Sequence, residues 1–156
     1  MGRTNLTSSL EDYLEAILGL ERESGEARVS DIAAQLKVSK SAVTGALKTL
    51  SDRKMVNYDP YQHVTLTGRG RKAAAGISER HEVLRRFLTE VLGLKPGVAE
   101  ANACRMEHVV DNVVLERLTD FAGFVAQWPP ALQKKLNEFL TRPRGKRAKK
   151  PKRGNG

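Results

Sequence analysis

The segment RVSDIAAQLKVSKSAVTGALKTLSDRKMV, residues 28–56, decides the fold of the N-terminal part of this chain. Ser30 and Ser39 are each predicted to be the N-cap of a short helix, because each precedes apolar residues at helical spacing. The two predicted helices are joined by a tight link at Lys37 and Val38. This is the pattern of a helix-turn-helix.

The second predicted helix of this segment has the character of a DNA-recognition helix. Val43, Leu47 and Leu50 mark its inner side, and its outward positions are small, polar or basic. Such a face suits the major groove and its phosphates, although an ordinary amphipathic helix is the alternative. With the two basic residues that follow the helix, the predicted DNA-binding residues are Ser39, Lys40, Ser41, Thr44, Lys48, Arg53 and Lys54.

The next stretch, MVNYDPYQHVTLTGRGR (residues 55–71), predicts a β-hairpin. We expect strands at 55–58 and 63–66, a turn around Asp59 and Pro60, and a new helix capped by Thr67. A hairpin directly after a helix-turn-helix is a wing. Together with the basic residues around it, the hairpin makes DNA binding the stronger interpretation.

The remaining predicted elements are helices. The first begins at Ser8, which with Glu11 fits a capping box. A long helix over 68–92 has His81 in its apolar stripe, where a lone histidine is most often a core residue. A further helix is predicted over 98–124, and a short one after Pro130. The fold class is therefore mainly α, with an N-terminal winged helix.

Charge and composition narrow the class of protein. The formal net charge is +9, but eight of the 27 basic residues lie in 141–156, which leaves 19 basic against 18 acidic residues in 1–140. We expect 141–156 to be a disordered basic tail that either contacts nucleic acid or aids solubility. No apolar run predicts a membrane span or a signal peptide, and one cysteine allows no internal disulfide. These features predict a cytoplasmic protein.

The segment ACRMEHVVDN, residues 103–112, contains the single cysteine. Cys104, Glu107 and His108 lie at i, i+3 and i+4, which a helix places in one sector roughly 100° wide. A thiol, a carboxylate and an imidazole are metal ligands by type. A buried structural cysteine and a surface Glu–His pair remain the alternatives.

Five stretches in order carry a resemblance to a known family: EDYLEAILGL, ARVSDIAAQLKVSKSAVTGALKTLSDRKMV, VTLTGRGRKAA, ERHEVLRRFL and ACRMEHVVDN. The chain resembles the metal-dependent repressors of the diphtheria toxin repressor and manganese transport regulator family. The resemblance implies a winged-helix DNA-binding domain at 1–73, an all-helical metal-binding and dimerisation domain at 74–140, and the basic tail at 141–156. It implies a homodimer that binds a double-stranded DNA operator when metal is bound.

The resemblance also implies which residues hold metal. The implied ligands are Asp12, Glu15, His81, Cys104, Glu107 and His108, with Glu100 as an ancillary candidate. Asp12 and Glu15 match the manganese type of the family, whereas Cys104 matches the iron type. Arg85 falls where the iron type has an acidic ancillary ligand, and arginine cannot ligate a metal. Cys104 favours Fe(II), with Mn(II) as the alternative, although affinity alone does not identify a metal.

The function that follows is a metal-dependent transcriptional regulator, a repressor of metal-uptake genes, with no small-molecule substrate and no enzymatic activity. The alternative is a winged-helix regulator that responds without metal to Cys104 oxidation or to an organic ligand. A metalloenzyme using Glu107 and His108 as acid and base, or a protein that binds DNA nonspecifically through its tail, are further alternatives.

Overall fold

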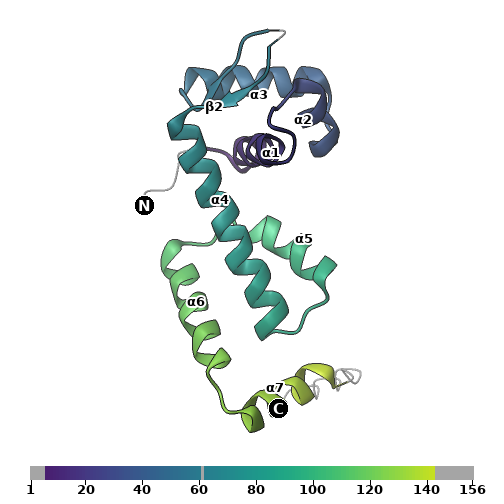
Figure 1. Cartoon of the computed structure of the whole chain (residues 1–156), viewed down its shortest axis with the longest axis vertical. Helices are drawn as coiled ribbons and strands as arrows, with labels where there is room; N and C mark the ends of the chain where they lie inside the picture. The colour runs from purple at the N-terminus through teal and green to yellow at the C-terminus, as the bar shows by residue number, and fades with distance from the viewer. Residues whose placement is uncertain (1–5, 61, 143–156) are drawn as a thin grey trace, which may run out of the picture.

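The structure, a computed structural model, describes residues 6–60 and 62–142, and these are mainly helical, as predicted. In chain order the elements are α1 (Ser8–Ser24), α2 (Val29–Leu36), α3 (Lys40–Asp52), β1 (Val56–Asn57), β2 (Thr65–Leu66), α4 (Gly68–Arg86), the π-helical turn η1 (Phe87–Val91), α5 (Pro96–Met106), α6 (Asn112–Ala126) and α7 (Pro130–Thr141). Figure 1 shows α4 as the long element that joins an upper part, built of α1–α3 and the hairpin, to the lower helices.

The upper part is a winged helix with its own apolar core. The apolar stripes of α1, α2 and α3 meet there. Fully buried members of this core are Leu14, Ile17, Ile32, Leu47 and Leu50. Because these residues recur at three- and four-residue intervals, each helix buries one face and leaves the other to solvent. The predicted helix-turn-helix is confirmed, since α2 and α3 are adjacent and joined by Lys37 in a left-handed conformation (φ 55°).

Only one of the two caps predicted in this segment is present. The Ser39 hydroxyl accepts a hydrogen bond from the Ala42 amide at 3.2 Å, which confirms it as the N-cap of α3. The prediction for Ser30 is wrong, because α2 begins at Val29 and Arg28 occupies the cap position. The Ser30 hydroxyl instead donates to the Asp31 carboxylate at 3.1 Å.

The wing is present, but its strands are shorter than predicted. They pair antiparallel over two residues each, with Val56 opposite Leu66. Val64, predicted to lie within the second strand, pairs instead with Ala27, the residue before the helix-turn-helix. The Ala27–Val64 bridge adds a third segment to the hairpin and holds the hairpin against the rest of the domain. Thr67 caps α4 as predicted, accepting from the Gly70 amide at 3.0 Å.

The lower part contains one helix more than predicted. The expected helix over 98–124 is wrong, because α5 ends at Met106 and α6 begins at Asn112. Asp111, at the N-cap position of α6, has an extended backbone (φ −75°, ψ 151°), and two β-branched valines precede it. A second core lies here, with Leu84, Ala103 and Leu115 among its buried members.

The predicted domains have two edges, the boundary between residues 73 and 74 and the start of the basic tail at residue 141. The expected tail lies outside the described residues from position 143 onward. α4 runs without interruption through the expected boundary between residues 73 and 74. No described helix is both long and apolar enough to cross a bilayer.

Candidate metal centre

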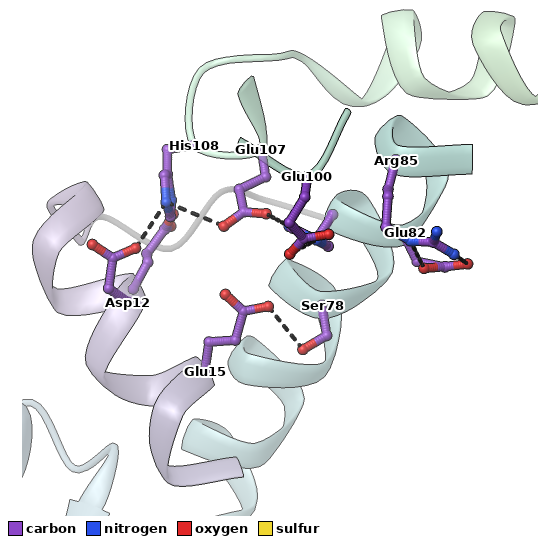
Figure 2. A network of polar contacts seen from close by, with 10 residues as sticks. Asp12, Glu15, Ser78, Glu82, Arg85, Glu100, Glu107 and His108 are labelled. Atoms are coloured by element: carbon purple, nitrogen blue, oxygen red, sulfur yellow. Dashed lines mark hydrogen bonds and ion pairs between the residues drawn. The ribbon is translucent and has the colours of Figure 1, made fainter. Parts of the chain in front are cut away.

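Acidic and imidazole side chains gather where the end of α5 meets α1 and α4 (Figure 2). α1 supplies Asp12 and Glu15, α4 supplies His81, and the turn after α5 supplies Glu107 and His108. The break between α5 and α6 therefore has a consequence for the site, because it places the last two side chains on a turn facing α1.

Three of these residues form a group with metal-site dimensions. Asp12, Glu107 and His108 each offer one ligand atom, and these atoms lie within 4.8 Å of one another. Nε2 of His108 is 3.0 Å from Asp12 Oδ1 and 3.3 Å from Glu107 Oε1. The Glu107 side chain is fully buried, and its Oε1 accepts no hydrogen bond from the described residues. A buried carboxylate oxygen without a donor fits a cation at this place.

The other predicted ligands surround this group. His81 lies beside Glu107, its Nδ1 2.6 Å from Glu107 Oε2, and its Nε2 is 3.1 Å from Glu100. Glu15 accepts a hydrogen bond from the Ser78 hydroxyl at 3.2 Å, as Figure 2 shows. Cys104 is exposed and is not one of the three residues that converge. Ligation by these four residues remains a prediction.

Arg85 lies near the ancillary candidate Glu100 but is already paired. Its Nε and Nη2 donate to the two oxygens of Glu82 at 2.9 and 2.8 Å. Figure 2 shows this pair on α4, beside Glu100. A bidentate pair between arginine and a carboxylate occupies both Glu82 oxygens.

The electrostatics of the centre favour the gain of a positive charge. Burial, and then the charge of Glu15, raises the pKa of Glu107 to about 7. Burial also raises the pKa of Asp12, although His108 opposes the shift. Burial lowers the pKa of His81, but Glu107 and Glu100 outweigh it and the net pKa is raised. Glu107 is therefore only partly ionised at neutral pH, because too little positive charge surrounds its buried carboxyl group.

Cys104 is affected by the same field. Burial and the nearby charges of Glu107 and Asp12 raise the pKa of its thiol above the usual value. A raised pKa reduces the thiolate fraction, which is the form that oxidants attack. This argues against regulation through oxidation of Cys104.

Glu11 is the residue at this site whose predicted role is wrong. The N-cap of α1 is Thr7, which accepts from the Leu10 amide at 3.4 Å, so the capping box predicted for Ser8 and Glu11 is absent. Glu11 is buried, and its Oε2 is 2.8 Å from Nδ1 of His108. Its place beside the apolar stripe of α1, three residues before Leu14, was the available signal.

The predicted DNA-binding residues lie on and just after α3. Ser39, Lys40, Ser41, Lys48, Arg53 and Lys54 are exposed, and Thr44 is partly exposed. Thr44 donates its hydroxyl proton to the Lys40 carbonyl at 2.9 Å, which leaves its oxygen able to accept. Figure 1 shows α3 at the end of the molecule away from α6 and α7.

Comparison with known proteins places this geometry in a family. The family model described as "Iron dependent repressor, N-terminal DNA binding domain" matches residues 5–64. The model described as "Iron dependent repressor, metal binding and dimerisation domain" matches residues 67–134. The chain belongs to the iron dependent repressor family. The resemblance found in the sequence is confirmed, as is the fold class.

Relatives of this iron dependent repressor family member are named as regulators. The chain is 38% identical over 117 residues to an HTH-type transcriptional regulator of Methanocaldococcus jannaschii, covering 74% of this chain and 94% of that one. It is 41% identical over 107 residues to the transcriptional regulator MntR of Escherichia coli O6:H1, covering 69% and 68%. Both relatives are named as transcriptional regulators, which is the class of protein predicted for this chain.

A solved structure agrees with the fold. A manganese-dependent transcriptional repressor in complex with manganese superposes with a TM-score of 0.68 at 28% identity. The match covers 74% of this chain and 53% of that one, so the chain spans about half the length of this solved relative.

Proposed function

We propose that this family member is a homodimeric transcriptional repressor of metal-uptake genes, which binds its operator when a divalent metal occupies the candidate centre. The observation that carries the proposal is the group of Asp12, Glu107 and His108, in which the buried Oε1 of Glu107 accepts no hydrogen bond from the described residues. The group joins α1 of the winged helix to the turn after α5. Since such a regulator must reach the chromosome, the proposal includes a cytoplasmic location.

We propose Mn(II) as the metal, with Fe(II) as the alternative. The preference for iron rested on Cys104, and the residues that converge are oxygen and nitrogen donors instead. Carboxylate-rich sites suit Mn(II), whereas a thiolate selects softer ions. The similarity to a manganese-dependent transcriptional repressor solved in complex with manganese supports the same choice.

Asp12 and Glu15 from α1, with Glu107 and His108 from the turn after α5, would hold the ion. When bound, a divalent cation supplies the positive charge that the crowded carboxylates lack. Asp12 and Glu107 then attract a common centre instead of repelling each other, which holds α1 against the lower helices. Because α1 packs on α2 and α3, this contact also sets the direction in which α3 faces.

We propose that the partner subunit covers the apolar surface of α6 and α7. The exposed apolar residues there are Val113, Val114, Phe121, Phe124, Leu132 and Phe139. The dimerisation domain matched by the family model includes all of them but Phe139, which continues the same surface. Two subunits joined in this way would present two α3 helices to half-sites about one DNA turn, roughly 34–36 Å, apart.

The test is DNA binding with and without metal. An operator is first selected from random DNA with Mn(II)-loaded protein, and its affinity is then measured anaerobically in chelator, Mn(II) and Fe(II). We expect binding with metal and loss of binding in chelator. Glu107→Gln and His108→Ala should lose the metal response while remaining folded, whereas Glu23→Gln, an exposed change on α1, should keep it. Equally tight operator binding in chelator contradicts the proposal.

A further inference from the structure

The hydrogen bond between Glu11 and His108 has no role in the function proposed so far. It joins residues 97 positions apart, from α1 and from the turn after α5. The Glu11 side chain is buried, and an ionised carboxylate buried this deeply needs strong compensation. Its position therefore requires an explanation beyond the capping that the sequence predicted.

The geometry divides the two nitrogens of His108 between two tasks. Nδ1 lies 2.8 Å from Glu11 Oε2, and because an ionised carboxylate can only accept, we assign the proton of this bond to Nδ1. Nε2 is left on the opposite edge of the ring, facing Asp12 and Glu107. A histidine that ligates through one nitrogen is oriented by the hydrogen bond of the other.

Arg80 supplies the compensation for Glu11. Its Nη2 is 3.8 Å from Glu11 Oε1, the oxygen that does not face His108, and the Arg80 side chain is only 14% exposed. Arg80 belongs to α4 and also lines a cleft of about 730 Å³ bordered by α4 and α6. Glu11 is thus placed between a cation on α4 and the imidazole of the candidate centre.

We propose that Glu11 is a positioning residue of the metal centre, which holds His108 through Nδ1 so that Nε2 faces the metal position before metal arrives. The inference rests on the proposed function for its metal, but the Glu11–His108 bond itself needs none. Glu11 would contribute to metal affinity without touching the ion. It would also join α1 to the lower helices in the metal-free protein.

The test uses three variants of the full chain. Glu11→Met keeps most of the side-chain volume and removes the acceptor, whereas Glu11→Gln keeps an acceptor oxygen and removes the charge. Glu23→Met is the matched control, since Glu23 lies exposed on the same helix. The chain has three histidines, so their ring nitrogens can be assigned by NMR after labelling with ¹⁵N-histidine.

The first measurement is made in chelator. We expect a slowly exchanging proton on Nδ1 of His108 in the wild type, in Glu11→Gln and in Glu23→Met, and its loss in Glu11→Met. The second measurement is the Mn(II) affinity, which should fall about 10- to 100-fold in Glu11→Met and much less in Glu11→Gln. If Glu11 contributed only by packing and did not accept from His108, its replacement by Met would leave the exchange rate of the Nδ1 proton unchanged.

The outcomes of these measurements that would overturn the proposal are clear. Equal protection of the Nδ1 proton in Glu11→Met and the wild type, or equal Mn(II) affinity, overturns the proposal. If Glu11→Met does not fold, the wild-type spectrum decides, because an unprotected or absent Nδ1 proton there overturns it as well. If the wild type binds neither Mn(II) nor Fe(II), the proposed function fails, and the chelator spectra still test the hold of Glu11 on His108.

Discussion

Gly70 occupies a position where the fold leaves no room for a side chain. A Cβ at this position would lie 1.8 Å from the Met55 carbonyl oxygen, which is backbone and cannot move away like a flexible side chain. The same carbonyl accepts from the Thr67 amide, so the start of α4 is pressed onto the wing. The close approach fixes how α4 leaves the winged helix.

Gly70→Ala should lower the free energy of unfolding by at least about 3 kcal/mol, because backbone must shift to admit a methyl group. Gly76→Ala is the matched control on the same helix, where a Cβ meets nothing within 4 Å. It should raise stability by about 0.5–1 kcal/mol through helix propensity. Urea unfolding of both variants checks this, and similar stabilities for the two would contradict it.

The carboxyl group of Glu107 links stability to pH. Its pKa of about 7 in the folded protein exceeds the usual value of 4.5, so the folded state binds the proton more tightly. Stability from this group is present below pH 4.5 and is lost as the pH rises through about 7. Asp12 and His81, whose pKa values are also raised, act in the same direction.

In chelator, the free energy of unfolding should therefore fall between about pH 5 and about pH 8, with Glu107 contributing up to roughly 3 kcal/mol. Glu107→Gln cannot titrate and should flatten the slope. Saturating Mn(II) should reverse the trend, because the ion binds the ionised carboxylate. Unfolding curves at a series of pH values measure all three, and an unchanged slope in Glu107→Gln would refute the assignment.

At the scale of elements, α3 is where the proposed DNA contact can be separated from folding. Lys48 is exposed on α3, and alanine is the best helix former, so Lys48→Ala should fold normally. If Lys48 contacts a phosphate, the slope of log affinity against log salt should fall by about 0.9. Lys135→Ala, on α7 far from α3, should leave the slope unchanged. Identical slopes for wild type and Lys48→Ala would remove Lys48 from the interface.

Element boundaries show what the sequence could predict and what it could not. The Ser39 and Thr67 caps and the apolar stripes of α1–α4 are local signals, and the structure confirms them. The break after Met106 is not marked by glycine or proline. Because apolar residues recur at helical spacing on both sides of it, the sequence predicted one continuous helix. The local sequence around Glu11 fits a capping box. Its contact with His108 arises only because the turn after α5 packs against α1, which local sequence does not reveal.

The same limit applies to the candidate metal centre. Residue types and the family resemblance predicted six ligands, whose side chains lie around the junction of α1, α4 and α5, and ligation by them stays a prediction. Spacing along one helix placed Cys104 in the same sector as Glu107 and His108. Because the helix ends at Met106, the last two follow a turn toward α1 and Cys104 stays exposed on α5.

At the scale of the whole molecule, the winged helix lies at one end of α4, whereas α6 runs along the other half of α4 and α7 lies beyond it (Figure 1). The candidate metal centre lies where α1 of the winged helix contacts the turn after α5. A change at this contact can therefore alter the direction of α3 relative to a dimer partner bound at the other end. Such coupling requires a dimer, so the dimer surface is the part of the proposal on which the rest depends.

Phe124 and Phe139 test that surface, since these two large apolar residues of α6 and α7 are 60% and 68% exposed. Phe124→Glu and Phe139→Glu should each weaken dimerisation by at least about 2 kcal/mol, roughly 30-fold, because a charge would be buried against the partner. Val38→Glu, at an exposed apolar position in the winged helix, is the control for dimerisation only, because Val38 precedes the predicted DNA-binding residue Ser39. Sedimentation equilibrium should show monomers for the two phenylalanine variants and dimers for the control, with operator binding lost in step with dimerisation. If both variants stay dimeric, the subunits meet elsewhere and the proposed dimer surface of α6 and α7 is wrong.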